Sequence, residues 1–363
     1  MNKTKIKTLL LTPRLSEPGG VANYYSVLQN HLPDDVEYFY IGNDSDGTIV
    51  GKVLRLLLDY ARFVRILIFN RPKIIHLNPS LGFKSTPRDA FFSLLGRFFL
   101  IKTVVFFRGW ELPVQNKINN NAFLLKLFSW SFFGSKKIIV LASDFDKVLR
   151  SWGYTGDIVI ETTIVDDSFV DYELPPLEQR FTKLLFLSRI ERKKGIFEVI
   201  DAFKSLKKSN PDLELSIAGD GPDMSSVVDY IDDNNIKGIS LLGYVKGNEK
   251  INVFLNHGVY LFPTSYGEGM PNALLEAMAF AMPVITSPAG GIADLFEDKK
   301  MGCLIKNPDS DSVKKAISEV LSDKNNQMVI GKYNRNYIKN RCVASKVAKR
   351  LINVYDSLIK DTN

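Results

Sequence analysis

The sequence predicts an α/β fold of two doubly wound, parallel-sheet domains that face each other across a cleft. Short apolar runs typical of strands alternate with helical patterns along the whole chain, which favours parallel sheets with crossover helices. The chain has 363 residues, more than one hydrophobic core usually serves. Pro175 and Pro176 interrupt the alternation, and a similar pattern restarts after them.

Six strands are expected before the two prolines and five after them, with helices between. The first six are predicted at 6–12, 36–41, 73–78, 102–108, 136–142 and 158–161, and the next five at 183–188, 213–218, 239–242, 259–262 and 284–286. We place the hinge at 174–177, a first domain at 1–172 and a second at 173–342. An amphipathic helix is predicted at about 343–363.

Composition excludes several classes of protein. Apolar residues make up 45% of the chain and charged residues 24%, which excludes a disordered, collagen-like or coiled-coil protein. The two cysteines, Cys303 and Cys342, form no CxxC pair, so neither a disulfide framework nor a zinc cluster is expected and a cytoplasmic location is predicted. No uncharged apolar run reaches the roughly 18 residues that cross a bilayer.

Positive charge is concentrated in residues 51–105. That stretch carries ten Lys and Arg against two Asp, interleaved with Leu and Phe. Such a mixture is typical of a peripheral surface for anionic membranes, and a solvated protein face is the alternative. A nucleic-acid partner is not expected, because no nucleic-acid-binding module is recognised.

The loop that follows the strand at 259–262 has the features of a ligand site. Its glycines allow a ligand to approach the backbone closely, and Pro271 opens a helix whose first amides can bind an anion such as a diphosphate. Glu268 and Glu276 are suited to holding sugar hydroxyls on either side of it. Alternatively, Glu268 only complements the helix dipole and Glu276 is a solvated helix residue.

A basic turn after the strand at 183–188 could neutralise that diphosphate. Arg189 and Lys194 are the predicted partners, because a guanidinium fork and an ammonium group would stabilise charge growing on a departing nucleotide diphosphate. A basic turn without a ligand role is the alternative, and it is the interpretation we give Arg192 and Lys193.

Gly19 and Gly20 follow the first strand, where a phosphate-binding loop is expected. The segment lacks the GxGxxG pattern, and no Walker loop is present, so no nucleotide cofactor is predicted. Asp-x-Asp pairs lie in turns and at a helix start, which favours capping over metal binding.

Six segments in this order resemble the retaining group 1 glycosyltransferases of the GT-B fold, which have two Rossmann-like domains. They are Pro18 to Val21, Arg189 with Lys194 and Gly195, Gly219 to Pro222, Gly243 to Val245, Glu268 to Glu276, and Gly290 to Asp294. The resemblance spans nearly the whole chain. It implies that the last helix packs back onto the first domain.

The resemblance also implies a role for individual residues. Arg189 and Lys194 would bind the donor diphosphate, Glu268 the transferred sugar and Glu276 the ribose. The backbone of Gly269, Met270 and Pro271 would contact sugar or phosphate, Tyr244 and Val245 would flank the base, and Gly19 and Gly20 would close over the phosphate.

The chain departs from the family pattern at Arg108, which stands where many relatives have a His. Arginine cannot act as a base near neutral pH, so its role is electrostatic or the site is degenerate. We expect acceptor contacts from His76, Arg108 and Glu111. His31 and His257 are interpreted as structural.

The predicted activity is metal-independent transfer of a hexose, with retention of configuration, from a nucleotide-diphosphate sugar to a glycan hydroxyl. UDP-hexose is the expected donor and GDP-mannose the second choice. A lipid-linked acceptor in bacterial surface polysaccharide assembly is expected if the basic region binds the inner face of the cell membrane. The alternatives are a catalytically silent carbohydrate-binding or partner subunit, and a sugar-nucleotide epimerase.

Overall fold

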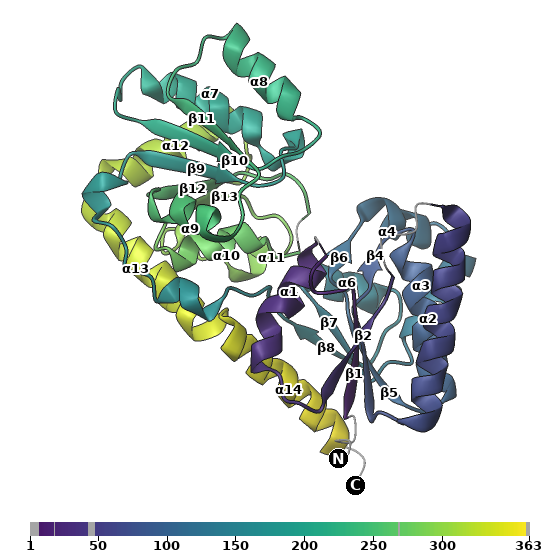
Figure 1. Cartoon of the computed structure of the whole chain (residues 1–363). Coiled ribbons are helices and arrows are strands. Elements are labelled where there is room, and N and C mark those ends of the chain that lie inside the picture. The colour runs from purple at the N-terminus through teal and green to yellow at the C-terminus, as the bar shows by residue number, and fades with distance from the viewer. Residues whose placement is uncertain (1–6, 18, 43–47, 268, 361–363) are drawn as a thin grey trace. The chain divides into compact units, whose positions relative to one another are not determined.

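The computed structural model describes residues 7–17, 19–42, 48–267 and 269–360. The chain divides into two compact units (Figure 1). The first comprises residues up to Ile164 together with the segment from Ala344 onward, and the second runs from Val165 to Val343.

The first unit is built on a six-stranded parallel sheet with the order β2-β1-β3-β5-β7-β8. Its strands are β1 (Thr8–Thr12), β2 (Val36–Tyr40), β3 (Ile74–Leu77), β5 (Lys102–Phe106), β7 (Lys137–Val140) and β8 (Asp157–Ile160). All six lie where the sequence predicts strands. A small parallel pair, β4 (Ser80–Leu81) with β6 (Gly109–Trp110), was not predicted, because two-residue strands leave no periodic signal.

Helices connect the strands of this first sheet. They are α1 (Gly20–Leu28), α2 (Ile49–Phe69), α3 (Ser85–Phe98), α4 (Leu112–Asn119), α5 (Ala122–Phe132) and α6 (Ser143–Ser151), with a short 3-10 turn η1 (Gln29–His31). α2 packs beside α3, and α3 packs beside α5.

The second unit holds another six-stranded parallel sheet, with the order β11-β10-β9-β12-β13-β14. Its strands are β9 (Lys183–Leu187), β10 (Glu214–Ala218), β11 (Ile239–Gly243), β12 (Val259–Phe262), β13 (Val284–Thr286) and β14 (Gly302–Leu304). The predicted parallel α/β architecture is therefore confirmed. The sequence missed β14, which is three residues long and begins with glycine.

The helices of the second unit again follow its strands. They are α7 (Ile196–Lys207), α8 (Met224–Asp233), α9 (Gly247–Leu255), α10 (Asn272–Ala279), α11 (Gly291–Leu295), α12 (Ser310–Ser322) and α13 (Lys324–Arg341), with 3-10 turns η2 (Asp167–Val170), η3 (Leu177–Gln179) and η4 (Arg192–Lys194).

Successive strand residues in the second unit enter different cores. Leu184 and Phe186 of β9 join a cluster that includes α7 and α12, whereas Leu185 between them joins a cluster that includes α10. This alternation is what a sheet covered by helices on both faces requires, and it makes the strands read as continuous apolar runs.

The units divide after Ile164, before the boundary after residue 172 that the sequence suggested. The intervening residues pack on the second unit. The Val165 amide donates to the Cys342 carbonyl at 3.0 Å, Arg335 donates to the carbonyls of Val170 and Tyr172, and the ring of Phe169 lies 5.4 Å from that of Phe280. Aromatic and backbone contacts of this kind are not visible in local sequence patterns.

The last helix, α14 (Ala344–Lys360), belongs to the first unit and packs beside α1. Its Arg350 forms two hydrogen bonds with the carboxylate of Glu161, at 2.6 and 2.8 Å. Its buried Tyr355 hydroxyl lies 2.6 Å from Nδ1 of His76, whose Nε2 lies 3.4 Å from the Tyr25 hydroxyl. The α14 helix thus contributes directly to the first core.

His76 makes the stability of this core depend on pH. The ring is fully buried, and burial, with a smaller effect of the Arg108 charge, lowers the pKa of His76 to about 3. The unfolded chain, with a histidine pKa near 6.5, therefore binds more protons between these values, and stability falls as pH falls below about 6.5.

We expect His76→Gln to remove part of this pH dependence. Between pH 7.5 and pH 5 the wild type should lose about 2 kcal/mol of unfolding free energy more than the variant does. Urea titrations of both proteins at the two pH values measure the difference. Equal losses would show that His76 is not buried in its neutral form.

Candidate active site

A cavity of about 560 Å³ opens at the carboxyl ends of β9, β10 and β11 and at the start of α10, within the second unit. Ligands of doubly wound sheets bind at this edge. The cavity is lined by Leu187, Ser188, Arg189, Gly219, Asp220, Gly221, Tyr244, Val245, Lys250, Asn272 and Ala273.

Glycines allow the loops around the cavity to pack closely against one another. A Cβ atom on Gly219 would collide with the Ser188 carbonyl oxygen, and one on Gly221 with the backbone of Ile190. Gly195 has φ 82°, and a Cβ there would collide with the Pro263 carbonyl oxygen. The loops after β9, β10 and β12 therefore approach more closely than residues with a side chain would allow.

The first turn of α10 supplies backbone donors to the cavity. The helix starts at Asn272, with Pro271 as its N-cap and no side-chain cap, so its first amides have no acceptor within the helix. Of the predicted backbone contacts here, Gly269 accepts a hydrogen bond from the Gly291 amide at 2.7 Å, and Met270 is buried in the adjacent core. This positive helix end suits a phosphate.

Glu276 lies on the buried side of α10, with 6% of its surface exposed. Its Oε2 is 2.5 Å from Nζ of Lys250, a residue of α9 that lines the cavity. The alternative that Glu276 is a solvated helix residue is therefore wrong. Lys250 compensates the charge of Glu276, and the Lys250 side chain lies between this carboxylate and the cavity that it lines.

Arg189 and Lys194 occupy different environments in the turn after β9. The Arg189 side chain lines the cavity, is 70% exposed and pairs with Glu191 through Nε at 3.1 Å. Lys194 is buried, with Nζ 4.8 Å from the centre of the Tyr266 ring, and does not line this cavity. Of the two predicted cations, only Arg189 borders the cavity.

Tyr244 and Val245 lie together on the cavity wall, as a pair that flanks a nucleotide base would have to. Tyr244 is 72% exposed, whereas Val245 is 6% exposed and packs into the core. The third of the predicted catalytic residues, Glu268, lies outside the described residues.

The sequence missed several residues of the cavity. Lys250 belongs to no motif recognised in the sequence. Only the structure, in which Lys250 of α9 forms an ion pair with Glu276 of α10, shows its place at the cavity. Asp220 and Asn272 lie inside recognised segments and Ser188 next to one, but no role of their own was predicted for them, although the rule that loops at the carboxyl edge converge would have placed them at the cavity.

The predicted glycine loop of the first unit lies at the start of α1. Gly19 is the N-cap, with φ 145°, and Gly20 is the first helical residue. A Cβ atom on either glycine would meet no atom within 4 Å, so the backbone is open to close approach.

His76 and Glu111, two of the three acceptor-side candidates, differ in accessibility. His76 is fully buried and bonded as described above, so its ring presents no surface to an acceptor in this structure. Glu111 is exposed at the N-cap of α4, and its Oε1 lies close to Gly82. The expectation of an acceptor contact from His76 is corrected to a structural role, because tyrosines enclose the ring.

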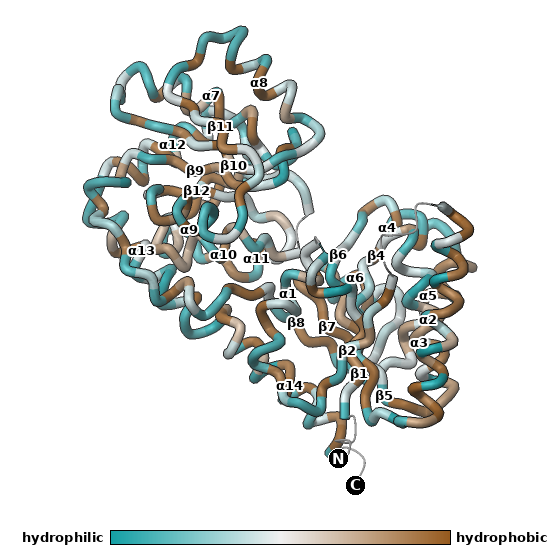
Figure 2. Tube along the Cα trace, in the orientation of Figure 1, coloured by the Kyte–Doolittle hydropathy of each residue, from teal (hydrophilic) through white to brown (hydrophobic). Residues whose placement is uncertain are grey.

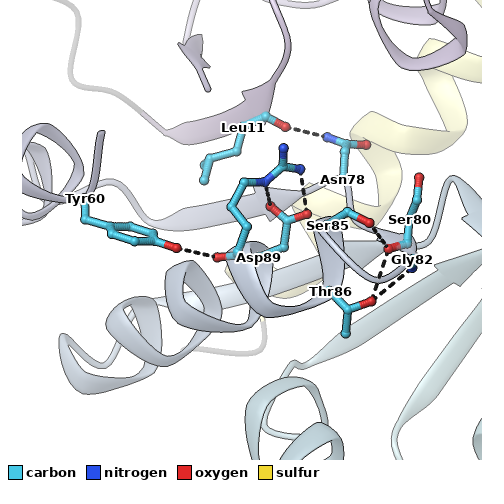
Figure 3. A network of polar contacts seen from close by, with 9 residues as sticks. Leu11, Tyr60, Asn78, Ser80, Gly82, Ser85, Thr86 and Asp89 are labelled. Atoms are coloured by element: carbon cyan, nitrogen blue, oxygen red, sulfur yellow. Dashed lines mark hydrogen bonds and ion pairs between the residues drawn. The ribbon is translucent and has the colours of Figure 1, made fainter. Parts of the chain in front are cut away.

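Arg108 follows β5 and lies on aromatic rings. Its Cζ is 3.6 Å from the centre of the Tyr24 ring and 4.2 Å from that of Phe106. Its amide donates to the Pro79 carbonyl at 2.8 Å. Figure 3 shows the surrounding loop, where Asn78 donates to the Leu11 carbonyl and the Ser80 carbonyl accepts from Ser85.

Comparisons with known proteins find a family match within the second unit. Residues 175–337 match the family described as "Glycosyl transferases group 1". The capsular polysaccharide biosynthesis glycosyltransferase CapM of Staphylococcus aureus is 26% identical over 51% of this chain and 50% of its own length. The putative teichuronic acid biosynthesis glycosyltransferase TuaC of Bacillus subtilis is 34% identical over 39% of this chain and 33% of its own length. The chain thus spans half or less of these relatives.

Solved structures share the fold. Sucrose-phosphate synthase from Thermosynechococcus elongatus superposes with a TM-score of 0.73 over 98% of this chain and 99% of that one, at 15% identity. Anabaena HepE, solved in complex with UDP and glucose, superposes with a TM-score of 0.70 over 97% of this chain and 100% of the HepE chain, also at 15% identity. Over residues 175–337 the chain therefore matches the group 1 family of glycosyltransferases, and its whole architecture is the GT-B fold of these solved structures.

Proposed function

We propose that this protein transfers a hexose from a nucleotide-diphosphate sugar to a hydroxyl of a glycan acceptor, with retention of anomeric configuration. The cavity of the second unit carries the proposal. It combines the exposed Arg189, the first amides of α10 and a wall formed by Tyr244 and Val245. It also includes Lys250, whose ammonium group forms an ion pair with the buried carboxylate of Glu276.

Each of these groups would bind a different part of a nucleotide sugar. The amides of Asn272 and Ala273 and the guanidinium of Arg189 would hold the diphosphate, and Tyr244 would cover the base. A ribose hydroxyl donating to Glu276 would share the carboxylate with Lys250. Charge that builds on the diphosphate as the sugar leaves is then met by donors already in place.

Retention does not require a protein base. As the bond between the sugar and the diphosphate breaks, the acceptor oxygen forms its bond on the same face, and the departing diphosphate takes the acceptor proton. This suits a chain in which Arg108 replaces the usual histidine, because arginine stays protonated.

The comparisons support the choice of donor and process. HepE was solved with UDP, so we propose UDP-hexose as the donor, ahead of GDP-mannose. The names of CapM and TuaC support a role in bacterial surface polysaccharide assembly. A silent subunit would leave a nucleotide sugar unchanged, and an epimerase would convert it without an acceptor, so analysis of the nucleotide products with and without a glycan separates the three functions.

We also propose that the first unit binds the inner face of the cell membrane, where a lipid-linked acceptor would lie. Val53, Leu54, Leu57 and Leu58 of α2 are each more than half exposed. Figure 2 shows hydrophobic residues along this helix, and the basic Lys52 and Arg65 are exposed on it too. Apolar residues flanked by positive charge suit an anionic bilayer surface. In the described part of the chain, no helix has the length and apolarity of a membrane span.

Arg189→Ala should lower the turnover number about 10²- to 10³-fold, because it removes one donor that stabilises the leaving diphosphate. The thermal midpoint should change little, since the side chain is 70% exposed. Steady-state kinetics with UDP-hexose and differential scanning fluorimetry measure the two effects. Arg192→Ala is the matched control, because Arg192 is exposed in the same turn but does not line the cavity. Equal turnover in both variants would argue against this diphosphate site.

Treatment with EDTA should leave turnover unchanged, because Arg189 and the α10 amides supply the positive charge that a metal ion provides in other transferases. The rate of nucleotide release is compared before and after dialysis against the chelator. Loss of activity that Mg²⁺ or Mn²⁺ restores would contradict a metal-independent mechanism.

Leu54→Asp with Leu57→Asp should reduce co-sedimentation with phosphatidylglycerol vesicles several-fold, because two acidic groups would face an anionic surface. Val329→Asp is the control, since Val329 is 65% exposed on α13 of the second unit. Binding of the wild type should weaken as salt increases. If the double variant sediments as fully as the wild type, α2 is not the membrane contact.

A further inference from the structure

Arg108 is a fixed cation at the carboxyl edge of the first sheet. It follows β5 directly, and its backbone is anchored to Pro79 in the loop after β3. The guanidinium lies on Tyr24 of α1, the helix that begins with the open glycine loop. Cation–π contact on both Tyr24 and Phe106 holds the side chain in one position.

The charge of Arg108 has no partner of opposite sign among the described residues. No ion pair joins it to any of their carboxylates, and its Nη1 is buried without a hydrogen-bond acceptor. The hydroxyl of Tyr24, which is 2% exposed, lies near this guanidinium but carries no negative charge. Glu161, after β8, is occupied by both hydrogen bonds from Arg350.

Such an arrangement is costly unless a ligand completes it. A buried donor on a charged group loses its hydration, and aromatic rings replace only part of that loss. Arginine is also the side chain that best matches the planar carboxylate and the phosphate, because its nitrogens form a fork. The absence of an ion-pair partner for Arg108 among the described residues, together with its partly exposed side chain, therefore indicates a site for an oxyanion.

We propose that Arg108 binds a carboxylate or phosphate of the acceptor, so that the acceptor is an acidic sugar or a phosphate-bearing glycan. This rests on the proposed transferase function and names its acceptor class. The donor diphosphate is the other possible source of an oxyanion, but it has partners of its own at Arg189 and the start of α10. Arg108 would then recognise acceptor charge, where many relatives carry a histidine.

Binding of simple anions tests the site without turnover. Thermal midpoints are measured at constant ionic strength with sodium glucuronate, with sodium phosphate and with neutral methyl glucoside, on the wild type, Arg108→Met and Arg108→Lys. Methionine keeps an apolar stem on the Tyr24 and Phe106 rings, and lysine keeps the charge without the fork. Lys126→Met, at an exposed position of α5 in the same unit, is the control.

We expect at least one of the two anions to raise the thermal midpoint of the wild type and of Lys126→Met. The same rise should require at least tenfold more anion in Arg108→Lys and be absent in Arg108→Met. If Arg108→Met does not fold, the comparison between lysine and arginine carries the test. An equal response to methyl glucoside, an unchanged response in the folded Arg108 variants, or no response of the wild type to either anion would overturn the proposal.

Calorimetric titration with UDP separates the acceptor from the donor. UDP affinity should be the same in the wild type and in Arg108→Met, and lower in Arg189→Ala. A tenfold loss of UDP affinity on Arg108→Met, without an effect on glucuronate or phosphate, would assign Arg108 to the donor and overturn the proposal. None of these binding measurements requires sugar transfer. Loss of anion binding in an Arg108 variant would therefore support the proposed anion site even if the protein showed no transferase activity.

Discussion

Close backbone approach at the carboxyl edge of the second sheet is the constraint on which the cavity of the second unit depends. Parallel strands bring their following loops to one edge, but side chains would normally keep those loops apart. At Gly195, Gly219 and Gly221 a Cβ atom would overlap a neighbouring backbone. The cavity wall is therefore made of loop backbone and a few side chains.

The two units manage buried charge differently. In the second unit, the charge of the buried Glu276 carboxylate is compensated by Lys250. In the first unit, Arg108 has aromatic rings beneath it and no carboxylate of the described residues beside it. A compensated charge can exchange partners when a ligand enters, whereas an uncompensated one gains a partner and so discriminates between charged and neutral ligands.

Most of the fold was readable from the sequence because both sheets are covered on two faces, which makes each long strand a continuous apolar run. β14 and the pair β4 and β6 escaped because they are too short to show a period. In the site, Arg189 was found through the basic turn after its strand and Tyr244 and Val245 through family segments, and the three share one cavity. Lys250 was not, because an ion pair between α9 and α10 depends on packing, and no spacing in the sequence encodes it.

His76 shows why residue type alone misassigned one residue of the first unit, and Arg108 shows what a departure from a family pattern can mean. A histidine at the end of a strand suggests chemistry, yet Tyr25 and Tyr355 enclose this one, and the nearby Arg108 charge disfavours its protonated form further. An arginine in place of a family histidine suggests a lost site, yet its guanidinium is held on two rings with a donor left unsatisfied. The neutral ring stabilises the core around α14, and the permanent cation is left to act on a ligand.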